Sequence, residues 1–314
     1  MTVLTAGETM ALLDPAGEGK PELGRQFALR VAGAESNFGI ALARLGVRVT
    51  WVSRLGSDPL GDVVHATLAG EGLDLRYVKR DANAPTGLFL KWRAGGRTNV
   101  IYYRKGSAAS RLEPGDVPDE ALDGVRLVHL TGITMALGAS ARELVVDVAR
   151  RARARGITVL FDPNWRSALW RGPGEATAAH REVLPNVDWY LCGLEEGNLL
   201  FETESGADLV AAVRDAGAGD VVVRVGARGA LVRHDGRLLE VPPPRVASVL
   251  DEVGAGDGFA AGFAFGLLRG FVPAECARAG NMIAAAALAG TGDWETFPRL
   301  DEVEPLLSRR SPAP

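Results

Sequence analysis

Cysteine and histidine are scarce in this sequence, and their positions exclude two classes of site. The 314 residues include two cysteines, Cys192 and Cys276, and four histidines. Two cysteines so far apart form neither a disulfide framework nor a zinc site, so each is expected to be a small buried hydrophobic residue. No two histidines have the spacing of metal ligands. We therefore expect a cytoplasmic protein without a histidine- or cysteine-held metal.

Long apolar runs and excess positive charge are missing as well. No apolar run reaches the ~20 residues of a membrane span, and residues 1–7 look like a buried strand rather than a signal peptide. The net charge is −4, which gives no support to nucleic-acid or membrane binding. Hydrophobic residues make up 47% of the chain and charged residues 24%, as is ordinary for a globular enzyme.

Two common nucleotide-binding motifs are also absent. The chain has no G-x-x-x-x-G-K-[ST] loop. After the first expected strand it has Gly7, Glu8 and Thr9, where a dinucleotide-binding domain would carry G-x-G-x-x-G. A nicotinamide-dependent dehydrogenase is therefore a distant alternative.

What the chain does have is an alternation of short β-branched runs with longer alanine-rich segments. This pattern predicts an α/β fold with a doubly wound, mostly parallel sheet flanked by helices, in a single domain of residues 1–314. Strands are expected at 47–52, 127–131, 157–161, 189–192 and 221–225, and helices at 37–45, 59–71, 140–155, 207–216, 255–268 and 273–288.

Four further segments alternate apolar and polar residues without helices between them. They are residues 8–14 and 27–31, and residues 86–93 and 97–104, the last two forming a hairpin. We interpret them as a small β-sheet lid over the site, contributed by roughly residues 8–31 and 86–104. The alternative is an irregular edge of the main sheet.

The most informative segment is Asp251–Phe259. Gly254, Ala255 and Gly256 have little side chain, so their N–H groups can converge on an anion at the start of the following helix. Asp257 inside such a site could take a proton from a nucleophile that attacks a phosphate. The alternative is that Asp257 only caps the helix.

A second segment, Ala32–Asn37, has a similar composition. Gly33 and Ala34 allow the backbone to approach a ligand, and the Asn37 amide offers a donor and an acceptor suited to adjacent sugar hydroxyls. The alternative is a helix start that Ser36 or Asn37 caps.

Together the two segments resemble the two signatures of the ribokinase-like PfkB carbohydrate kinases, and the resemblance extends over nearly the whole chain, to Thr296. It implies ATP-dependent phosphorylation of a sugar hydroxyl, with Asp257 as the catalytic base and Gly254, Ala255 and Gly256 as the anion hole. It also implies a lid that often forms the contact of a homodimer. An exposed lid sheet would have edges or an apolar face to cover, which favours the same dimer.

The resemblance implies nucleotide and metal contacts too. Glu196 falls where the family has an N-x-x-E motif tied to Mg²⁺ and phosphate, but Gly193 replaces the asparagine, which leaves Glu196 a water-mediated role. Asp251 matches the D-T-x-G-A-G-D pattern, in which Glu252 replaces the threonine. A monovalent cation is a further cofactor that we consider. The nucleotide contacts implied are Asn164, Arg166, Gly193, Glu196, Arg224, Gly226, Arg228, Gly229, Gly256 and Asn281.

The choice of sugar depends on the segment Tyr102–Ala108. Its aromatic pair can stack on a carbon chain while Arg104 holds an anion, and Arg166 follows another strand end. A neutral hexose needs no arginine clamp, whereas a sugar acid does. The alternative is that Arg104 and Lys105 are surface charges.

This segment is similar to that of the 2-keto-3-deoxygluconate kinases of the family. The similarity implies phosphorylation of the terminal hydroxyl to give the 6-phosphate, with a fructokinase or another sugar kinase as the alternative and a non-catalytic sugar-binding protein as a distant one. Phe89 departs from the subgroup, which often has a tyrosine there. The pocket residues implied are Gly33, Ala34, Asn37, Phe89, Tyr103, Arg104, Ile133, Arg166, Asp257 and Asp293.

Overall fold

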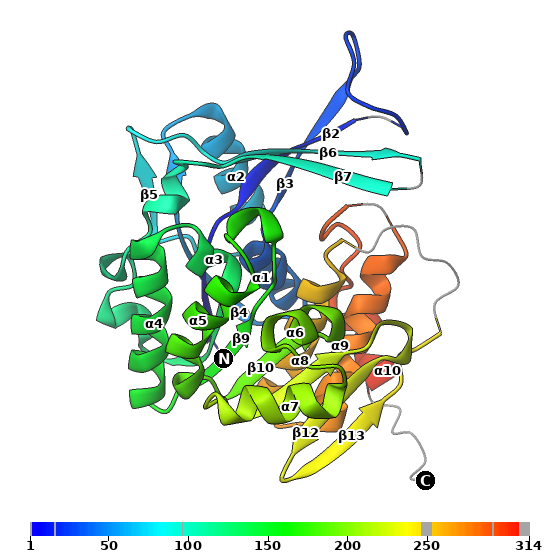
Figure 1. Ribbon diagram of the computed structural model, residues 1–314. Coiled ribbons are helices and arrows are strands. Elements are labelled where there is room, and N and C mark those ends of the chain that lie inside the picture. Colours follow the sequence, from blue (N-terminus) through cyan, green and yellow to red (C-terminus); the bar gives the residue numbers. More distant parts are fainter. Residues whose placement is uncertain (1, 16, 96, 246–252, 291, 308–314) are drawn as a thin grey trace.

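The fold is built on one large sheet and one small sheet (Figure 1). The computed structural model describes residues 2–15, 17–95, 97–245, 253–290 and 292–307. Asp251 and Glu252 lie outside the described residues. Within them, no helix is long and apolar enough to cross a membrane.

The large sheet has nine strands in the order β13-β12-β11-β10-β9-β8-β1-β4-β5. Seven of them run parallel, and β12 and β13 add an antiparallel hairpin at one edge. The strands are β1 Thr2–Ala6, β4 Arg48–Gly56, β5 Val78–Asp81, β8 Val125–Thr131, β9 Thr158–Asp162, β10 Trp189–Gly193, β11 Asp220–Arg224, β12 Ala230–His234 and β13 Arg237–Val241.

Helices cover both faces of this sheet, as expected for buried parallel strands. One hydrophobic core lies under α3 to α7 and the other under α1, α2, α8, α9 and α10. The bounds are α1 Ala34–Arg44, α2 Pro59–Gly70, α3 Gly132–Ala136, α4 Ala139–Ala154, α5 Pro173–Val183, α6 Leu194–Phe201, α7 Gly206–Asp215, α8 Ala255–Arg269, α9 Pro273–Leu288 and α10 Leu300–Leu307.

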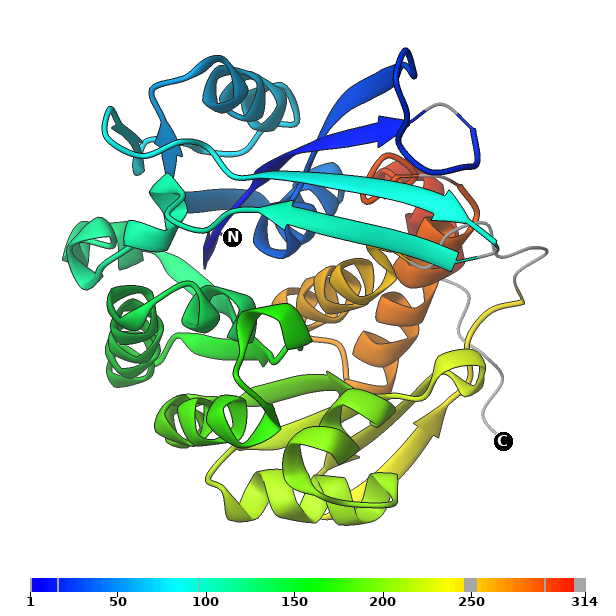
Figure 2. The same ribbon diagram turned by 45° about the horizontal axis from the view of Figure 1, so that its top comes forward.

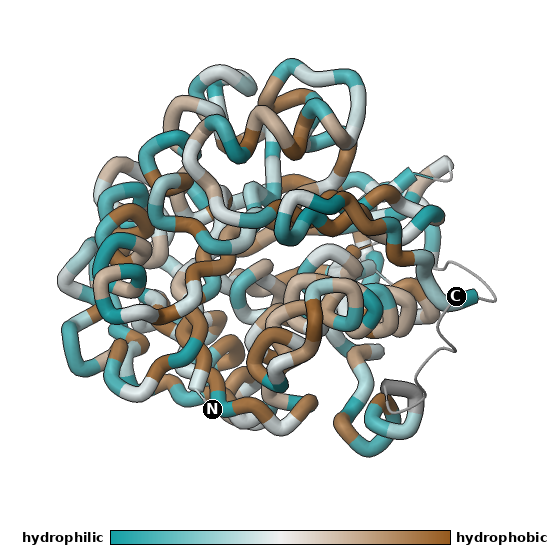
Figure 3. The backbone as a smooth tube through the Cα atoms, turned by 90° about the horizontal axis from the view of Figure 1, so that it is seen from below, coloured by the Kyte–Doolittle hydropathy of each residue, from teal (hydrophilic) through white to brown (hydrophobic). Residues whose placement is uncertain are grey.

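Side chains that alternate along each strand supply the two cores. Val221 and Val223 belong to the core under α3 to α7, whereas Val222 belongs to the other core. In Figure 3, brown hydrophobic stretches run between teal hydrophilic ones along the helices, because each helix buries one side. Both cysteines are free and buried, as expected. The predicted fold class is confirmed, although the sequence did not predict β5, α3, α5, α6, α10 and the β12–β13 hairpin.

The small sheet stands apart from the large one (Figure 2). Its strands are β2 Met10–Pro15, β3 Phe27–Ala32, β6 Leu88–Ala94 and β7 Arg97–Tyr103, in the order β3-β2-β6-β7. The four predicted segments therefore form a sheet of their own, and the alternative of an irregular main-sheet edge is wrong. Phe89 pairs with Tyr102 and Leu90 with Ile101, so the two pairs lie on opposite faces.

Candidate active site

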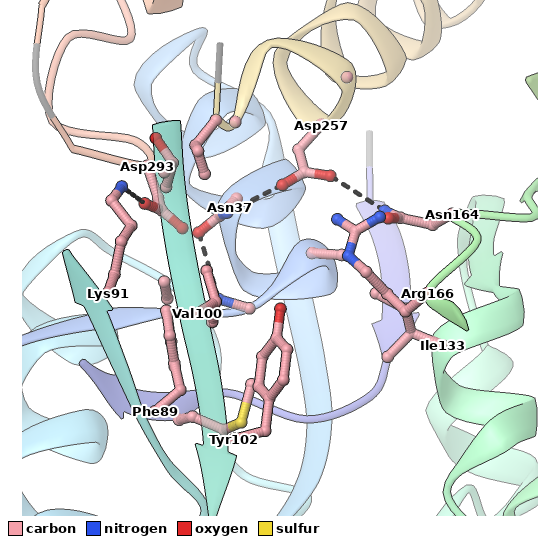
Figure 4. A pocket seen from close by; sticks show the side chains of 18 of the residues that line it. Asn37, Phe89, Lys91, Val100, Tyr102, Ile133, Asn164, Arg166, Asp257 and Asp293 are labelled. Carbon is pink, nitrogen blue, oxygen red and sulfur yellow. Dashed lines mark hydrogen bonds and ion pairs between the residues drawn. The ribbon is translucent and has the colours of Figure 1, made fainter. Parts of the chain in front are cut away.

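A pocket of about 830 Å³ lies between the small sheet and the carboxyl ends of the central strands (Figure 4). Parallel sheets place their ligands at this edge, since the loops after the strands converge there. The residues predicted from sequence that line this pocket are Gly33, Ala34, Asn37, Phe89, Arg104, Ile133, Asn164, Arg166, Glu196, Arg224, Gly254, Gly256, Asp257 and Asp293.

Asp257 lies in the first turn of α8, where the chain enters the helix through a left-handed residue. Gly254 is the N-cap, with φ 78°. A Cβ at Gly254 would lie 1.8 Å from the carbonyl oxygen of Asp293, so only glycine fits. Gly254 and Gly256 line the pocket, whereas Ala255 packs against the core. The predicted anion hole therefore has two of its three residues at the pocket wall.

Two asparagines hold the carboxylate of Asp257 (Figure 4). Asn37 Nδ2 donates to Oδ2 at 2.8 Å, and Asn164 Nδ2 donates to Oδ1 at 3.3 Å. The three residues come from α1, from the turn after β9 and from α8. Asp257 therefore has partners across the pocket, which a simple helix cap would not need.

The helix that carries Asn37 begins earlier than predicted. α1 starts at Ala34 with Gly33 as its N-cap, so Asn37 is not the cap and its amide can reach Asp257.

Burial raises the pKa of Asp257 to about 7, and the charges of Asp162 and Asp293 act in the same direction. The hydrogen bond from Asn37 and the charge of Arg166 oppose this shift. A carboxylate with such a pKa exchanges a proton near neutral pH, which is what a general base needs.

This shift predicts how Asp257 affects stability. Its folded pKa lies above the unfolded value, so its contribution to the free energy of unfolding falls as pH rises from about 4 to about 7 and stays low above. Asp257→Asn removes an ionising group, so the variant should melt a few degrees higher than the parent at pH 8 and at nearly the same temperature at pH 4. Thermal denaturation at both pH values tests this. An equal difference at the two pH values would contradict the raised pKa.

A buried charged network supports the turn that carries Asn164. Arg224 Nη1 lies 2.6 Å from Asp162 Oδ2 and 3.3 Å from the carbonyl oxygen of Gly256. Glu196 accepts from the Trp165 backbone N–H at 2.6 Å. Asn164 adopts a left-handed φ of 42°, unusual for a residue with a side chain, and the neighbouring bonds hold it there.

The pocket wall formed by the small sheet is also charged. Arg104 is buried, and its Nε lies 2.7 Å from Glu8 Oε2. Ser107 donates to the other oxygen of Glu8. Arg104 is therefore no surface charge, and its carboxylate partner within the chain is Glu8. The Tyr102 ring lies 5.6 Å from the Arg104 guanidinium.

The prediction that Tyr103 lines the pocket is wrong. Tyr103 is 62% exposed on the opposite face of β7, and Tyr102 lines the pocket instead. Successive strand residues point to opposite faces, so Tyr102 is on the face of its cross-strand partner Phe89. Aligning the two predicted strands of the hairpin would have placed Tyr102 opposite Phe89, and directly paired residues lie on the same face of a sheet.

Sequence reasoning also missed Lys91 and Glu8 among the charged lining residues. Lys91 Nζ lies 3.0 Å from Asp293 Oδ1, and both side chains are buried. A lysine in the apolar phase of a strand is a signal that could have identified it, because lysine is seldom buried unless it is paired.

Comparison with known proteins identifies the family. The family model described as "pfkB family carbohydrate kinase" matches residues 2–299. The chain belongs to this family.

Relatives of the kinase share nearly its full length. A 2-dehydro-3-deoxygluconokinase of Bacillus subtilis (strain 168) is 35% identical over 312 residues, covering 98% of this chain and 96% of the relative. A 2-dehydro-3-deoxygalactonokinase of Haloferax volcanii is 35% identical over 314 residues, covering 97% and 96%.

Solved structures agree. A PfkB protein from Polaromonas sp. JS666 has a TM-score of 0.87 at 37% identity, covering 96% of this chain and 98% of that one. An E. coli protein solved in complex with ATP and Mg²⁺ has a TM-score of 0.88 at 25% identity, covering 98% and 99%.

The remaining predicted nucleotide contacts lie away from this pocket. Gly226, Arg228 and Gly229 form the turn between β11 and β12, and Asn281 in α9 donates to the carbonyl oxygen of Val241 at 3.1 Å. Gly193 precedes α6 and is not part of the pocket wall. Their contacts with a nucleotide stay predictions.

The described residues contain no cluster of side chains that could hold a metal ion by itself. No three His, Cys, Asp or Glu side chains there are grouped to hold a metal ion. The carboxylate of Glu196 already accepts from two backbone N–H groups, those of Trp165 and Gly193. Burial and the charge of Asp162 raise the pKa of Glu196, whereas the charge of Arg224 and the two hydrogen bonds oppose this shift. The water-mediated role of Glu196 toward Mg²⁺ stays a prediction.

Proposed function

We propose that this kinase transfers the terminal phosphoryl group of ATP to the terminal hydroxyl of 2-keto-3-deoxygluconate and releases the 6-phosphate. The observation that carries the proposal is Asp257, with its pKa of about 7, between the glycines at the start of α8 and the arginine-lined part of the pocket. The name of the Bacillus subtilis relative supports the choice of sugar.

Asp257 would act as the base. Its ionised carboxylate takes the proton of the sugar hydroxyl while the hydroxyl oxygen forms a bond to phosphorus and the bond from phosphorus to the ADP oxygen breaks. The shorter bond from Asn37 holds Oδ2, so the hydroxyl would displace the longer 3.3 Å contact of Asn164 at Oδ1. Gly254 and Gly256 would stabilise the charge on the transferred group through their N–H groups and the helix dipole.

The small sheet would act as a lid that excludes water from this reaction. ATP supplies the phosphoryl group, and Mg²⁺ would enter with it, bound to phosphate oxygens, as in its usual coordination. The E. coli structure with ATP and Mg²⁺ supports this pairing. The monovalent cation stays a prediction.

A sugar acid fits the charges of the pocket better than a neutral hexose. Arg166 lines the pocket beside Asp257, and Arg104 lines it with Glu8 as its partner. Arginine at two positions suits a planar carboxylate. Phe89 brings no hydroxyl to the pocket. By their names, relatives act on both gluconate- and galactonate-type acids, so an assay with both epimers is needed to identify the preferred one.

A coupled ADP-release assay on a panel of sugars tests the proposal. We expect turnover with 2-keto-3-deoxygluconate or its galactonate epimer that exceeds turnover with fructose and ribose by at least about tenfold, since Arg166 would lose its carboxylate partner in a neutral sugar. Fast turnover with fructose and none with either acid would favour the fructokinase alternative. Sugar binding by calorimetry without ADP release would favour a non-catalytic protein.

We also propose a homodimer through the outer face of the small sheet. Leu29, Leu13, Leu90 and Ile101 lie in one cross-strand row on that face, and Leu29 and Ile101 are exposed. The exposed Tyr103 of β7 shares this face. An apolar row of this kind on a sheet is a typical contact surface.

Light scattering of the full chain tests the dimer. We expect a mass about twice the 33.1 kDa of one chain, and Ile101→Glu should shift it to one chain because the charge would be buried in the contact. Thr98→Glu, on the other face of β7, is the matched control and should stay dimeric. A parent protein that is monomeric at micromolar concentration would refute the proposal.

A further inference from the structure

Lys91 of β6 lines the pocket, and its ammonium group pairs with Asp293, which belongs to the body of the kinase. It follows Phe89 on the pocket face and lies opposite Val100 of β7. Its Nζ lies 3.0 Å from Asp293 Oδ1, and the two side chains are only 6% and 8% exposed. Figure 4 shows the pair at the side of the pocket away from Arg166.

Asp293 is held firmly at this position. Its carbonyl oxygen packs against Gly254, the left-handed residue that begins the anion hole. The following residues are tied to the small sheet, because Trp294 Nε1 donates to the Val31 carbonyl at 2.8 Å and Arg30 lies 2.7 Å from Glu295. The backbone that carries Asp293 is therefore anchored beside the pocket.

The Lys91–Asp293 pair affects the net charge of the pocket wall that a substrate contacts. Besides Asp293, the carboxyl groups of Glu8, Glu18, Glu196 and Asp257 line the pocket, and Arg104 offsets that of Glu8. Without Lys91, the carboxylate of Asp293 would be buried in the wall without its ion partner at 3.0 Å, and it would repel a negatively charged substrate. A neutral sugar would not experience this repulsion.

We propose that Lys91 is a specificity-determining residue, which neutralises Asp293 and thereby allows the pocket to accept a sugar acid. This inference rests on the proposed function, because it concerns the same pocket. Lys91 acts through Asp293 and also places a cation on the pocket wall, so its loss weakens binding of anions selectively.

The test compares two inhibitors that differ in one group, D-gluconate with a carboxylate and D-glucitol with a hydroxymethyl group. Their dissociation constants are measured by calorimetry for the parent, Lys91→Met, Lys91→Arg, Asp293→Asn and the double variant Lys91→Met/Asp293→Asn. Thermal denaturation of each variant establishes that it is folded. Methionine keeps the length of the lysine chain without its charge, and arginine keeps the charge.

We expect Lys91→Met to weaken gluconate binding by at least about tenfold and glucitol binding by less than about threefold, with Lys91→Arg near the parent. In the Asp293→Asn background the same lysine change should cost gluconate much less, because the repelling charge is gone. If Lys91→Met does not fold, gluconate binding by the double variant is compared with gluconate binding by Asp293→Asn. A tenfold weaker binding by the double variant would overturn the role of Asp293.

Equal losses for the two inhibitors, or no loss for either, would overturn the inference, and so would a parent protein that does not bind gluconate. The proposed function fails differently. A parent that selects gluconate over glucitol but phosphorylates neither 2-keto-3-deoxygluconate nor its epimer would contradict the proposed substrate and leave the role of Lys91 standing.

Discussion

Replacing Asp257 by asparagine (Asp257→Asn) is expected to lower kcat by about 10²- to 10⁴-fold while the KM values for ATP and the sugar change little. The amide keeps the size of the side chain, and its single oxygen can still accept the 2.8 Å hydrogen bond from Asn37, although the 3.3 Å bond from Asn164 is lost. It cannot accept the proton of the sugar hydroxyl. Steady-state kinetics with the sugar that the panel identifies gives both constants.

Asp208→Asn is the matched control for this change. Asp208 is the third residue of α7, as Asp257 is the third residue of α8, so both carboxylates interact with the N-terminus of a helix. Asp208 lies outside the pocket and should leave kcat within about twofold of the parent. If Asp257→Asn stays within about tenfold of the parent, a general-base role is wrong.

Gly254→Ala is expected to lower kcat by about 10²- to 10³-fold, the range seen when a donor to a developing anion is displaced. The added Cβ would lie 1.8 Å from the carbonyl oxygen of Asp293, and Gly254 has a φ of 78°. The backbone at the start of α8 must therefore move, and it would carry the N–H groups of the anion hole with it. Assays of kcat and of thermal stability measure the effect.

The same helix provides a control at its other end. Gly270, the C-cap of α8, has a φ of 75° but no atom within 4 Å of an added Cβ. Gly270→Ala should therefore cost only the left-handed strain, about 1–2 kcal/mol, and leave kcat nearly unchanged. Equal kcat values for the two variants would show that the position of Gly254 does not matter for catalysis.

Much of the fold could be predicted because its signals are local. Alternation of β-branched and alanine-rich runs predicted the parallel strands and the helices between them, and α9 has the predicted bounds, Pro273–Leu288. The β12–β13 hairpin was not predicted, because these short edge strands show no clear alternation of apolar and polar residues. The prolines that follow, from Pro242, predicted a loop.

The site residues could be predicted from sequence only where the reacting groups lie together in one short segment. Glycines followed by an acid at a helix start indicated Gly254, Gly256 and Asp257, and all three line the pocket. The choice between Tyr102 and Tyr103 was wrong because an error of one residue in strand phase turns every side chain to the other face. Only the pairing of β6 with β7 decides that phase.

The sequence by itself determined the family, the α/β class and the segment that holds Asp257, because each depends on residues close together in the chain. Only the tertiary structure decided which distant side chains meet. Asn37 reaches Asp257 across 220 residues, and Lys91 reaches Asp293 across 202 residues. The first contact follows from the packing of α1 against α8, and the second from the position of the small sheet beside the pocket. No local pattern records the geometry by which separate elements pack.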